Sequence, residues 1–220
     1  YSASNKVYDG SISATVVGSL NSVVSGDTVT LANTSATFAD KNVGTGKTVT
    51  ISGLSLGGAD ATNYSLSNTS ATTTAAITAK SLTASYTASD KTYDGATSAT
   101  VVGSLNSVVS GDTVTLANTS ATFADKNVGT GKTVTISGLS LGGTDAGNYT
   151  LSSTSTTTTA AITAKSLTAS YTASDKTYDG SRTATVSASS SDIVTGDAVT
   201  ISHSSATFAD KNVGTGKTVS

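Results

Sequence analysis

The chain has 220 residues, of which 12 are Lys or Arg and 14 are acidic, and its formal net charge is −2. This balance provides no basic surface for nucleic acid or anionic lipid, and the apolar runs are too short for a membrane span. The chain contains no Cys and no Glu, two of the side chains that enzymes use most for nucleophilic and acid–base chemistry.

The residue inventory favours strands over helices. Ser and Thr make up more than a third of the chain, and Val, Ile, Thr and Tyr outnumber Leu, Lys and Arg. Residues with branched or aromatic side chains suit a pleated surface, whereas the strong helix formers are scarce. We therefore predict an all-β fold.

The sequence repeats with a period of 85 residues, and residues 13–58 are identical to residues 98–143 at all 46 positions. The repeat is marked by the triplets Tyr8-Asp9-Gly10, Tyr93-Asp94-Gly95 and Tyr178-Asp179-Gly180. Since 85 residues can bury a core of their own, we predict tandem compact β domains at residues 1–80, 81–165 and 166–220, the third incomplete. The chain begins without Met, and we expect it to be a stretch of a longer array.

Within the second copy, apolar and polar residues alternate in about seven short segments, the pattern of half-buried strands. Turn residues separate these segments at 93–95, 110–112, 125–131 and 142–147. The residues expected to face inward are Leu82, Ala84, Tyr86, Ala99, Val101, Val114, Leu116, Ala121, Phe123, Val134, Ile136, Tyr149, Leu151 and Ile162. The third copy has Ser in place of Val102 and Leu105, which predicts a solvent-facing position for the first and a partly exposed one for the second.

The junctions between copies are short. Ile77 and Leu82 are five positions apart, as are Ile162 and Leu167, with no Gly or Pro between them. We expect the last strand of one copy to run almost directly into the first strand of the next, which favours a stiff array.

Two motifs predict local structure. In the Tyr-Asp-Gly triplets, Asp is expected to cap backbone N–H groups, Gly to take positive φ, and Tyr to pack with its hydroxyl satisfied. The pair Asn148-Tyr149 is similar to the tyrosine corner of immunoglobulin-type domains, with Leu151 at the Cys position. This pattern favours an immunoglobulin-like β-sandwich, with a β-grasp-like domain as the alternative.

Candidate chemistry is sparse. The oxygens of Asp125 and Asn127 resemble the start of a calcium loop, but the twelfth position is Ile136 instead of Glu, and a Gly-rich connection fits better. His203 stands where the other copies have Asn, so no repeated site can use it. An amide between Lys91 or Lys132 and Asn148 is a further hypothesis. We predict no metal, no cofactor, no catalytic residue and no enzymatic activity.

The order of motifs through one copy identifies a family resemblance. The segments 91–95, 111–116, 123–132, 138–139, 148–149 and 161–163 together resemble the YDG-type repeats of large exported bacterial adhesins, which include filamentous-haemagglutinin-like proteins. The resemblance implies a stalk or fibre outside a bacterium, and it brings no catalytic residue with it.

We therefore expect a non-enzymatic structural repeat of a secreted or cell-surface bacterial adhesin. The alternative is a repeated weak binding module that contacts glycans, ice or a partner fibre through Ser/Thr-rich faces. Expected partners are other copies of the chain in a fibre, or host or surface glycans, without nucleic acid or membrane insertion. The third copy lacks counterparts of Tyr149, Leu151 and Ile162, so it is expected to be frayed or to be completed by neighbouring chain.

Overall fold

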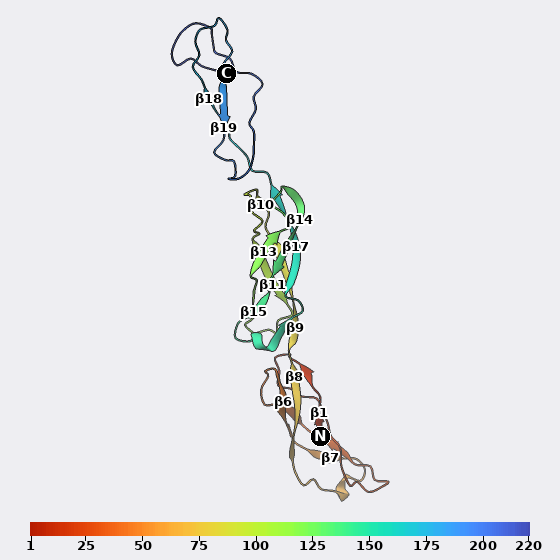
Figure 1. Ribbon diagram of the computed structural model, residues 1–220. Helices are drawn as coiled ribbons and strands as arrows, with labels where there is room; N and C mark the ends of the chain where they lie inside the picture. The colour runs from red at the N-terminus through yellow and green to blue at the C-terminus, as the bar shows by residue number, and fades with distance from the viewer. The chain divides into compact units, whose positions relative to one another are not determined.

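The computed structural model describes all 220 residues and is all-β, with 19 strands and two short 3₁₀ helices (Figure 1). The predicted fold class is therefore confirmed. The finer prediction of an immunoglobulin-like sandwich, with its β-grasp-like alternative, stays a prediction. The chain has no helix of the length and apolar character needed to cross a bilayer.

The elements follow the sequence repeat. The first copy contains β1 (Ser2–Ala3), β2 (Lys6–Val7), β3 (Val16–Val17), β4 (Thr30–Ala32), β5 (Ser35–Phe38), β6 (Gly44–Ser52), β7 (Ser55–Gly57), η1 (Ala61–Asn63) and β8 (Ser70–Thr78). The second contains β9 (Lys80–Ala88), β10 (Lys91–Thr92), β11 (Val101–Asn106), β12 (Thr115–Ala117), β13 (Ser120–Phe123), β14 (Gly129–Ser137), β15 (Ser140–Gly142), η2 (Ala146–Asn148), β16 (Tyr149–Leu151) and β17 (Ser155–Thr163). The third contains β18 (Ser170–Ala173) and β19 (Val186–Ser189).

The chain divides into two compact units. The first comprises Tyr1–Ala88, Thr100–Ala121 and Thr135–Thr158, and the second comprises Ser89–Ala99, Thr122–Val134 and Thr159–Ser220. The first copy lies in the first unit, whereas residues of the second copy belong to both. The domain limits expected from the sequence period stay predictions.

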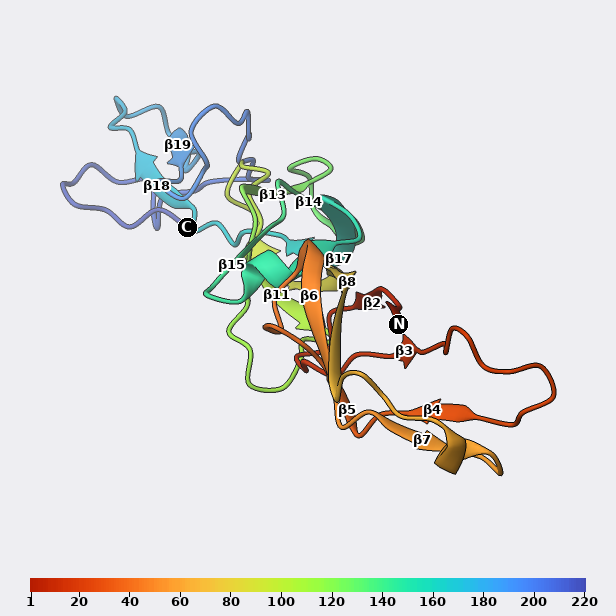
Figure 2. The ribbon, with the colours of Figure 1, turned by 90° about the horizontal axis from the view of Figure 1, so that it is seen from below.

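A four-stranded sheet with the order β2-β8-β6-β5 forms the main layer of the first copy (Figure 2). Strand β6 is antiparallel to both of its neighbours, β5 and β8, and β2 pairs with β8 in parallel. Strand alternation puts Val49 and Ile51 on the buried face, where Phe38 and Ile77 join them, all at 2% exposure or less. The opposite face carries exposed threonines in register, Thr48 opposite Thr74 and Thr50 opposite Thr72.

The second copy repeats these elements because it repeats the sequence. Its corresponding sheet has the order β10-β17-β14-β13, and β12 pairs with β15 as β4 pairs with β7. On β9 the predicted alternation holds, with Leu82 buried and the side chains on either side of it exposed. Val102 is 69% exposed, which confirms its predicted solvent-facing position, and Leu105 is partly buried.

Only Ala79 separates β8 from β9, so the predicted direct passage from one copy to the next is confirmed at this junction. Strand β9 is held by β11 on one side and by β16 on the other, where Leu82 lies opposite Leu151. After β17, in contrast, the next strand begins only at Ser170, and Leu167 is 40% exposed. Residues 164–169 therefore separate the two strands at this junction, so the passage is less direct than at the first one.

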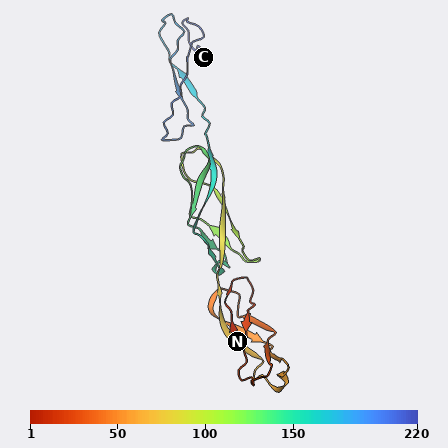
Figure 3. The same ribbon diagram turned by 90° about the vertical axis from the view of Figure 1, so that its right-hand side faces the viewer.

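The third copy has little regular structure (Figure 3). It has one strand pair, β18 with β19, and single bridges at Thr183–Thr207 and Phe208–Val219. Tyr171 and Tyr178 are 50% and 58% exposed, and Val213 is 88% exposed.

Two glycines of the first copy allow the cost of a positive φ to be separated from the cost of a steric clash when Ala replaces Gly. Gly26 and Gly58 both have φ of +103°, but a Cβ at Gly26 would meet nothing within 4 Å, whereas one at Gly58 would clash with the backbone carbonyl of Thr28. We expect Gly26→Ala to lower the free energy of unfolding by about 1 kcal/mol through φ alone. Gly58→Ala should cost at least about 2 kcal/mol more, because the clash is with backbone that cannot rotate away.

Chemical denaturation of the two variants measures this difference. Equal losses of unfolding free energy in the two variants would contradict the predicted clash, because they would mean that the backbone at Thr28 moves aside without an energetic cost.

Candidate functional site

The Tyr-Asp-Gly triplet forms a turn closed by a lysine. Asp9 Oδ1 accepts the backbone N–H of Ser11 at 2.8 Å and the ammonium of Lys6 at 2.7 Å, and Gly10 has φ of +80°. Lys6 also lies over the ring of Phe38, 5.7 Å from its centroid. The same ion pair recurs in the second and third copies as Lys91–Asp94 and Lys176–Asp179. The turn thereby presents Tyr8, the first residue of the triplet, to the next copy.

The hydroxyl of Tyr8 bonds a residue of the next copy. It donates to Asp112 Oδ2 of the second copy at 2.7 Å, and Tyr149 of the second copy donates to the same oxygen at 2.6 Å. The two rings pack edge to face with centroids 5.3 Å apart. One carboxylate, with only 3% of its side chain exposed, is therefore shared by tyrosines from two copies.

Lys41 completes the junction from the first copy. Its ammonium donates to Asp112 Oδ1 at 2.9 Å, lies 3.8 Å from Asp145 Oδ1, and sits 5.8 Å from the centroid of the Tyr8 ring. Both oxygens of Asp112 are thus engaged, which compensates for removing this charge from water.

Asn148, the buried polar residue of this region, adds a second set of contacts. It is 6% exposed, and its side-chain oxygen accepts the backbone N–H of Val43 at 2.9 Å. Its amide nitrogen lies 3.4 Å from Asn42 Oδ1. A backbone N–H buried at an interface needs such a partner, so Asn148 fixes the position of the 42–43 loop against η2.

The electrostatics follow from these contacts. Hydrogen bonds from Tyr149 and Tyr8, with Lys41 beside them, lower the pKa of Asp112 to about 2 despite burial. Burial and the hydrogen bond to Asp112 raise the pKa of Tyr149 to about 12 and also raise the pKa of Tyr8. The hydrogen bond to Asp112 raises the pKa of Lys41. At neutral pH Asp112 is therefore an anion, Lys41 is a cation, and Tyr8 and Tyr149 are neutral phenols.

The junction between the second and third copies repeats part of this network. Tyr93 donates to Asp197 Oδ2 at 2.7 Å, and Lys126 lies 3.1 Å from Asp197 Oδ1 and 5.8 Å from the Tyr93 ring centroid. Within residues 1–220, Tyr93 is the tyrosine that bonds Asp197.

Burial of the triplet tyrosine increases with the amount of following copy that covers it. Tyr8, covered by a complete copy, is 1% exposed, Tyr93 is partly exposed, and Tyr178 is 58% exposed. The buried cluster of the first unit likewise combines Tyr8, Phe38 and Ile51 with Leu82 and Tyr149 of the next copy. The hydrophobic core therefore continues across the junction.

One sequence interpretation, the tyrosine corner, is not supported. Tyr149 does accept a backbone N–H, from Val109 at 3.0 Å, but that residue is 40 positions upstream, whereas a tyrosine corner bonds a few residues upstream. This residue therefore gives no support for an immunoglobulin-like sandwich. His203 is exposed, and its ring lies edge to face with Tyr171 at 6.0 Å.

The remaining candidate groups have other partners. Asp125 Oδ1 accepts Lys132 and the backbone N–H of Asn127, both at 2.7 Å, so the calcium-like loop is closed by a lysine. Lys91 is bonded to Asp94 at 2.7 Å, and Asn148 is held by the loop of the first copy. The amide hypothesis therefore gains no support at these residues.

Sequence pattern alone does not reveal the junction. It places Asp112 in a turn and Lys126, the counterpart of Lys41, in a Gly-rich connection, and neither assignment predicts a contact between copies. One signal could have found it: the period places Tyr8, Lys41 and Asp112, or their counterparts, in every copy, and a charged pair repeated together with a tyrosine suggests mutual contact.

The fold and the junction define the class: a tandem all-β repeat in which each copy docks on the next through a tyrosine–aspartate–lysine network. The family model of the YDG domain matches residues 1–75, 78–159 and 163–220. The chain belongs to the YDG domain family. No curated protein and no solved structure matches it.

Two tyrosines provide a matched test of the network. The hydroxyl of Tyr149 donates to Asp112 and accepts from Val109, whereas the buried hydroxyl of Tyr86 has no hydrogen-bond partner. We expect Tyr149→Phe to lower the free energy of unfolding by about 2 kcal/mol, because a charged acceptor loses a donor. Tyr86→Phe should be neutral or slightly stabilising, because it removes an unsatisfied polar group.

Urea denaturation of both variants measures these changes. The role assigned to the junction would be contradicted if the two substitutions had the same effect.

The Asp112 carboxylate predicts loss of stability in acid. Its pKa is about 2 in the folded chain against an ordinary value of 3.8, so the unfolded chain binds the proton more tightly. The contribution of Asp112 is complete above about pH 5 and is lost as the pH falls from about 4 to about 2. At the alkaline end, the raised pKa of Tyr149 predicts a second loss above about pH 10.

Thermal unfolding of the chain and of Asp112→Asn between about pH 2 and about pH 7 separates the contribution of Asp112 to stability from the contributions of the other carboxylates. The variant should be less stable at neutral pH, and the difference from the unmodified chain should shrink toward the acid limit. A difference that does not change with pH would exclude the carboxylate as the source.

Proposed function

We propose that this chain is a structural spacer, part of the stalk or fibre of a secreted or surface-exposed bacterial adhesin, and that it has no enzymatic activity. Membership of the YDG domain family and the resemblance to repeats of large exported adhesins support this proposal. The adhesin role, the bacterial host and the extracellular location rest on the resemblance. Labelling of intact cells of the source organism with an antibody against the chain tests the location.

One observation carries the spacer function. The junction residues of each copy pair with the next copy in the same way, with Tyr8, Lys41 and Asp112 at one junction and Tyr93, Lys126 and Asp197 at the other. A contact made in the same way at every junction repeats the same geometry, so each added copy adds the same increment of length. Because the tyrosine and aspartate of the complete junction are buried, they serve this contact and are not presented to a soluble substrate.

A copy-number series tests the spacer. Chains lengthened by one or two further copies of residues 81–165, inserted after Lys165, can be compared by small-angle X-ray scattering. We expect the maximum dimension to increase by a constant amount per copy. Asp112→Ala in every copy should remove the constant increment, because each junction loses the acceptor that holds both tyrosines.

An array of copies joined flexibly would give a different result. Its dimension grows with about the square root of copy number, and this result for the unmodified chains would refute the spacer. Far-UV circular dichroism of the Asp112→Ala chains provides the control, since the strands of each copy should be retained.

A second candidate function is favoured by the threonine face of the β6–β8 pair. Thr48, Thr50, Thr72 and Thr74 form a regular exposed array of hydroxyl and methyl groups, and the second copy carries Thr at all four counterparts. Such a face suits weak, repeated contact with a glycan or with ice, multiplied by avidity. Glycan arrays and ice adsorption distinguish the two functions, because a pure spacer binds neither.

A further inference from the structure

A short strand near the start of each of the first two copies pairs in parallel with the last strand of the same copy. In the first copy β2 lies beside the end of β8, with Lys6 opposite Ile77. In the second copy β10 lies beside the end of β17, with Lys91 opposite Ile162. Both isoleucines are 1% exposed, so each parallel contact is anchored in the core of its copy.

Three hydrogen bonds strengthen this contact in the first copy. The backbone N–H of Tyr8 donates to the carbonyl oxygen of Thr78 at 2.8 Å. The hydroxyl of Thr78 donates in return to the carbonyl oxygen of Lys6 at 3.2 Å. Just before β2, the side-chain oxygen of Asn5 accepts the backbone N–H of Ala76 at 2.7 Å. Backbone and side chains therefore both join the start of the copy to its end.

The second copy repeats the three bonds. Tyr93 donates its backbone N–H to the carbonyl oxygen of Thr163 at 2.8 Å, and the hydroxyl of Thr163 donates to that of Lys91 at 3.3 Å. The residue before β10 is Asp90 instead of Asn, and its Oδ1 accepts the backbone N–H of Ala161 at 2.6 Å. The contact is thus kept although one of its side chains has changed.

Parallel pairing determines how a pull along the chain loads these bonds. The chain enters each pair at the start of the short strand and leaves it at the end of the last strand, so the two points of attachment lie at opposite ends of the pair. A pull between these points acts along the strands and strains all bonds of the pair at once. In an antiparallel pair pulled apart at adjacent ends, the bonds would open one after another.

The second copy contains a further parallel pair with the same loading. Strand β9, which follows the first junction, pairs in parallel with β16, where Leu82 lies opposite Leu151. Tension from the preceding copy reaches the start of β9, and tension from the following copy reaches β16 through β17. The strand that first receives the load is therefore also held against sliding.

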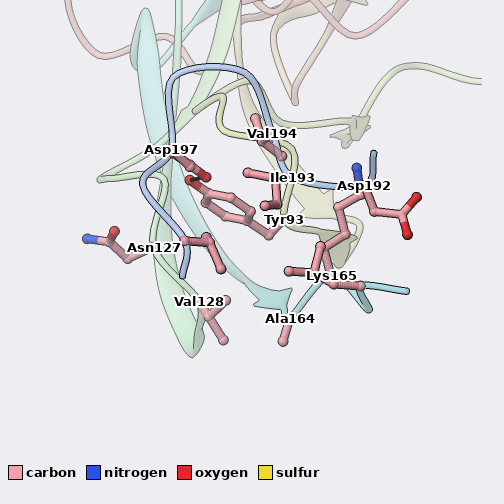
Figure 4. A pocket seen from close by; sticks show the side chains of 11 residues that line it. Tyr93, Asn127, Val128, Ala164, Lys165, Asp192, Ile193, Val194 and Asp197 are labelled. Carbon is pink, nitrogen blue, oxygen red and sulfur yellow. Dashed lines mark hydrogen bonds between the residues drawn. The ribbon is translucent and has the colours of Figure 1, made fainter. Parts of the chain in front are cut away.

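The tyrosine of the triplet connects the parallel contact to the junction. Tyr93 bonds Thr163 of its own copy through its backbone N–H, and its hydroxyl donates to Asp197 of the next copy at 2.7 Å. Figure 4 shows this hydroxyl directed toward Asp197. Tyr8 makes the corresponding two bonds at the first junction. One residue in each of these copies therefore takes part in both contacts.

We propose that the parallel pairs β2–β8, β9–β16 and β10–β17 act as a mechanical clamp, which keeps the first two copies folded when the chain is pulled from its two ends. The inference goes beyond the spacer function, because a spacer needs a fixed length but no resistance to tension. The junction sets the length added per copy, whereas the clamp sets the lifetime of a copy under load. Either property can therefore fail in experiment while the other holds.

Single-molecule pulling at constant force in two directions tests the clamp. Handles at the chain ends load the parallel pairs along their strands. Handles at Ser35→Cys and Ser70→Cys pull across the first sheet, because Ser35 lies opposite Ser52 and Ser52 lies opposite Ser70. Both serines are exposed and the chain has no Cys of its own, so the attachment is defined.

The direction of pulling should decide the rate of unfolding. At equal force, the first copy pulled across its sheet should unfold at least about tenfold faster than a copy pulled from the chain ends, because its bonds open in sequence. Opening of one copy from the ends releases on the order of 280 Å of chain, which identifies the step. The same cysteine variant held at its ends is the control for the two substitutions.

Threonine variants test the side-chain bonds of the clamp. Thr78→Val and Thr163→Val together remove the hydroxyl donors to Lys6 and Lys91. The unfolding rate of these copies under end-to-end force should rise about fivefold, as expected when a bond that resists unfolding is lost.

A matched pair of threonines outside the clamp provides the control. Thr34 and Thr119 donate hydroxyl bonds of the same kind and length, 3.2 and 3.3 Å, to the carbonyl oxygens of Ser52 and Ser137. These bonds do not join the start of a copy to its end. Thr34→Val and Thr119→Val together should therefore leave the unfolding rate under end-to-end force nearly unchanged.

Two results would overturn the proposal: equal unfolding rates in the two pulling directions, or equal acceleration by the clamp variants and by the control variants. The comparison of directions uses one folded chain, so it does not depend on how well the threonine variants fold. Scattering from the copy-number series is measured without force and tests the spacer separately.

Discussion

A single buried carboxylate holds the junction between copies together. Asp112 receives hydrogen bonds from a tyrosine of each of two copies and a charge-assisted bond from Lys41. Each donor partners an oxygen of the buried Asp112 carboxylate. Loss of one donor leaves this charge less well compensated for its removal from water, which destabilises the whole network. The rings of Tyr8 and Tyr149 then extend the apolar core of one copy into the next.

This arrangement changes how the repeat should be understood. The sequence suggests self-sufficient domains, because 85 residues suffice for a core. The structure adds that part of the core is completed by the following copy, as the graded burial of Tyr8, Tyr93 and Tyr178 shows. In that respect the array has a property of stacked repeats, in which nearest-neighbour interfaces contribute to the stability of each unit.

Local features were predictable from the sequence, whereas long-range ones were not. Alternation identified the buried face of β9 and the exposed position of Val102, since strand geometry alone determines which face a side chain occupies. The Asp112 site could not be read in this way, because its partners lie 104 and 71 positions upstream and 37 downstream. Tyr149 illustrates the same limit: its motif suggested a local corner, yet its hydroxyl bonds residues 37 and 40 positions away.

The single residue between β8 and β9 has a consequence for how such an array can change length. Strands present alternate faces from one residue to the next, so inserting or deleting one residue at Ala79 would turn the inward side chains of β9 outward relative to β8. It would also move Asp112 away from the reach of Tyr8. Growth or shortening by whole periods leaves every junction unchanged, which makes duplication or loss of complete copies the one form of length variation that this architecture accommodates freely.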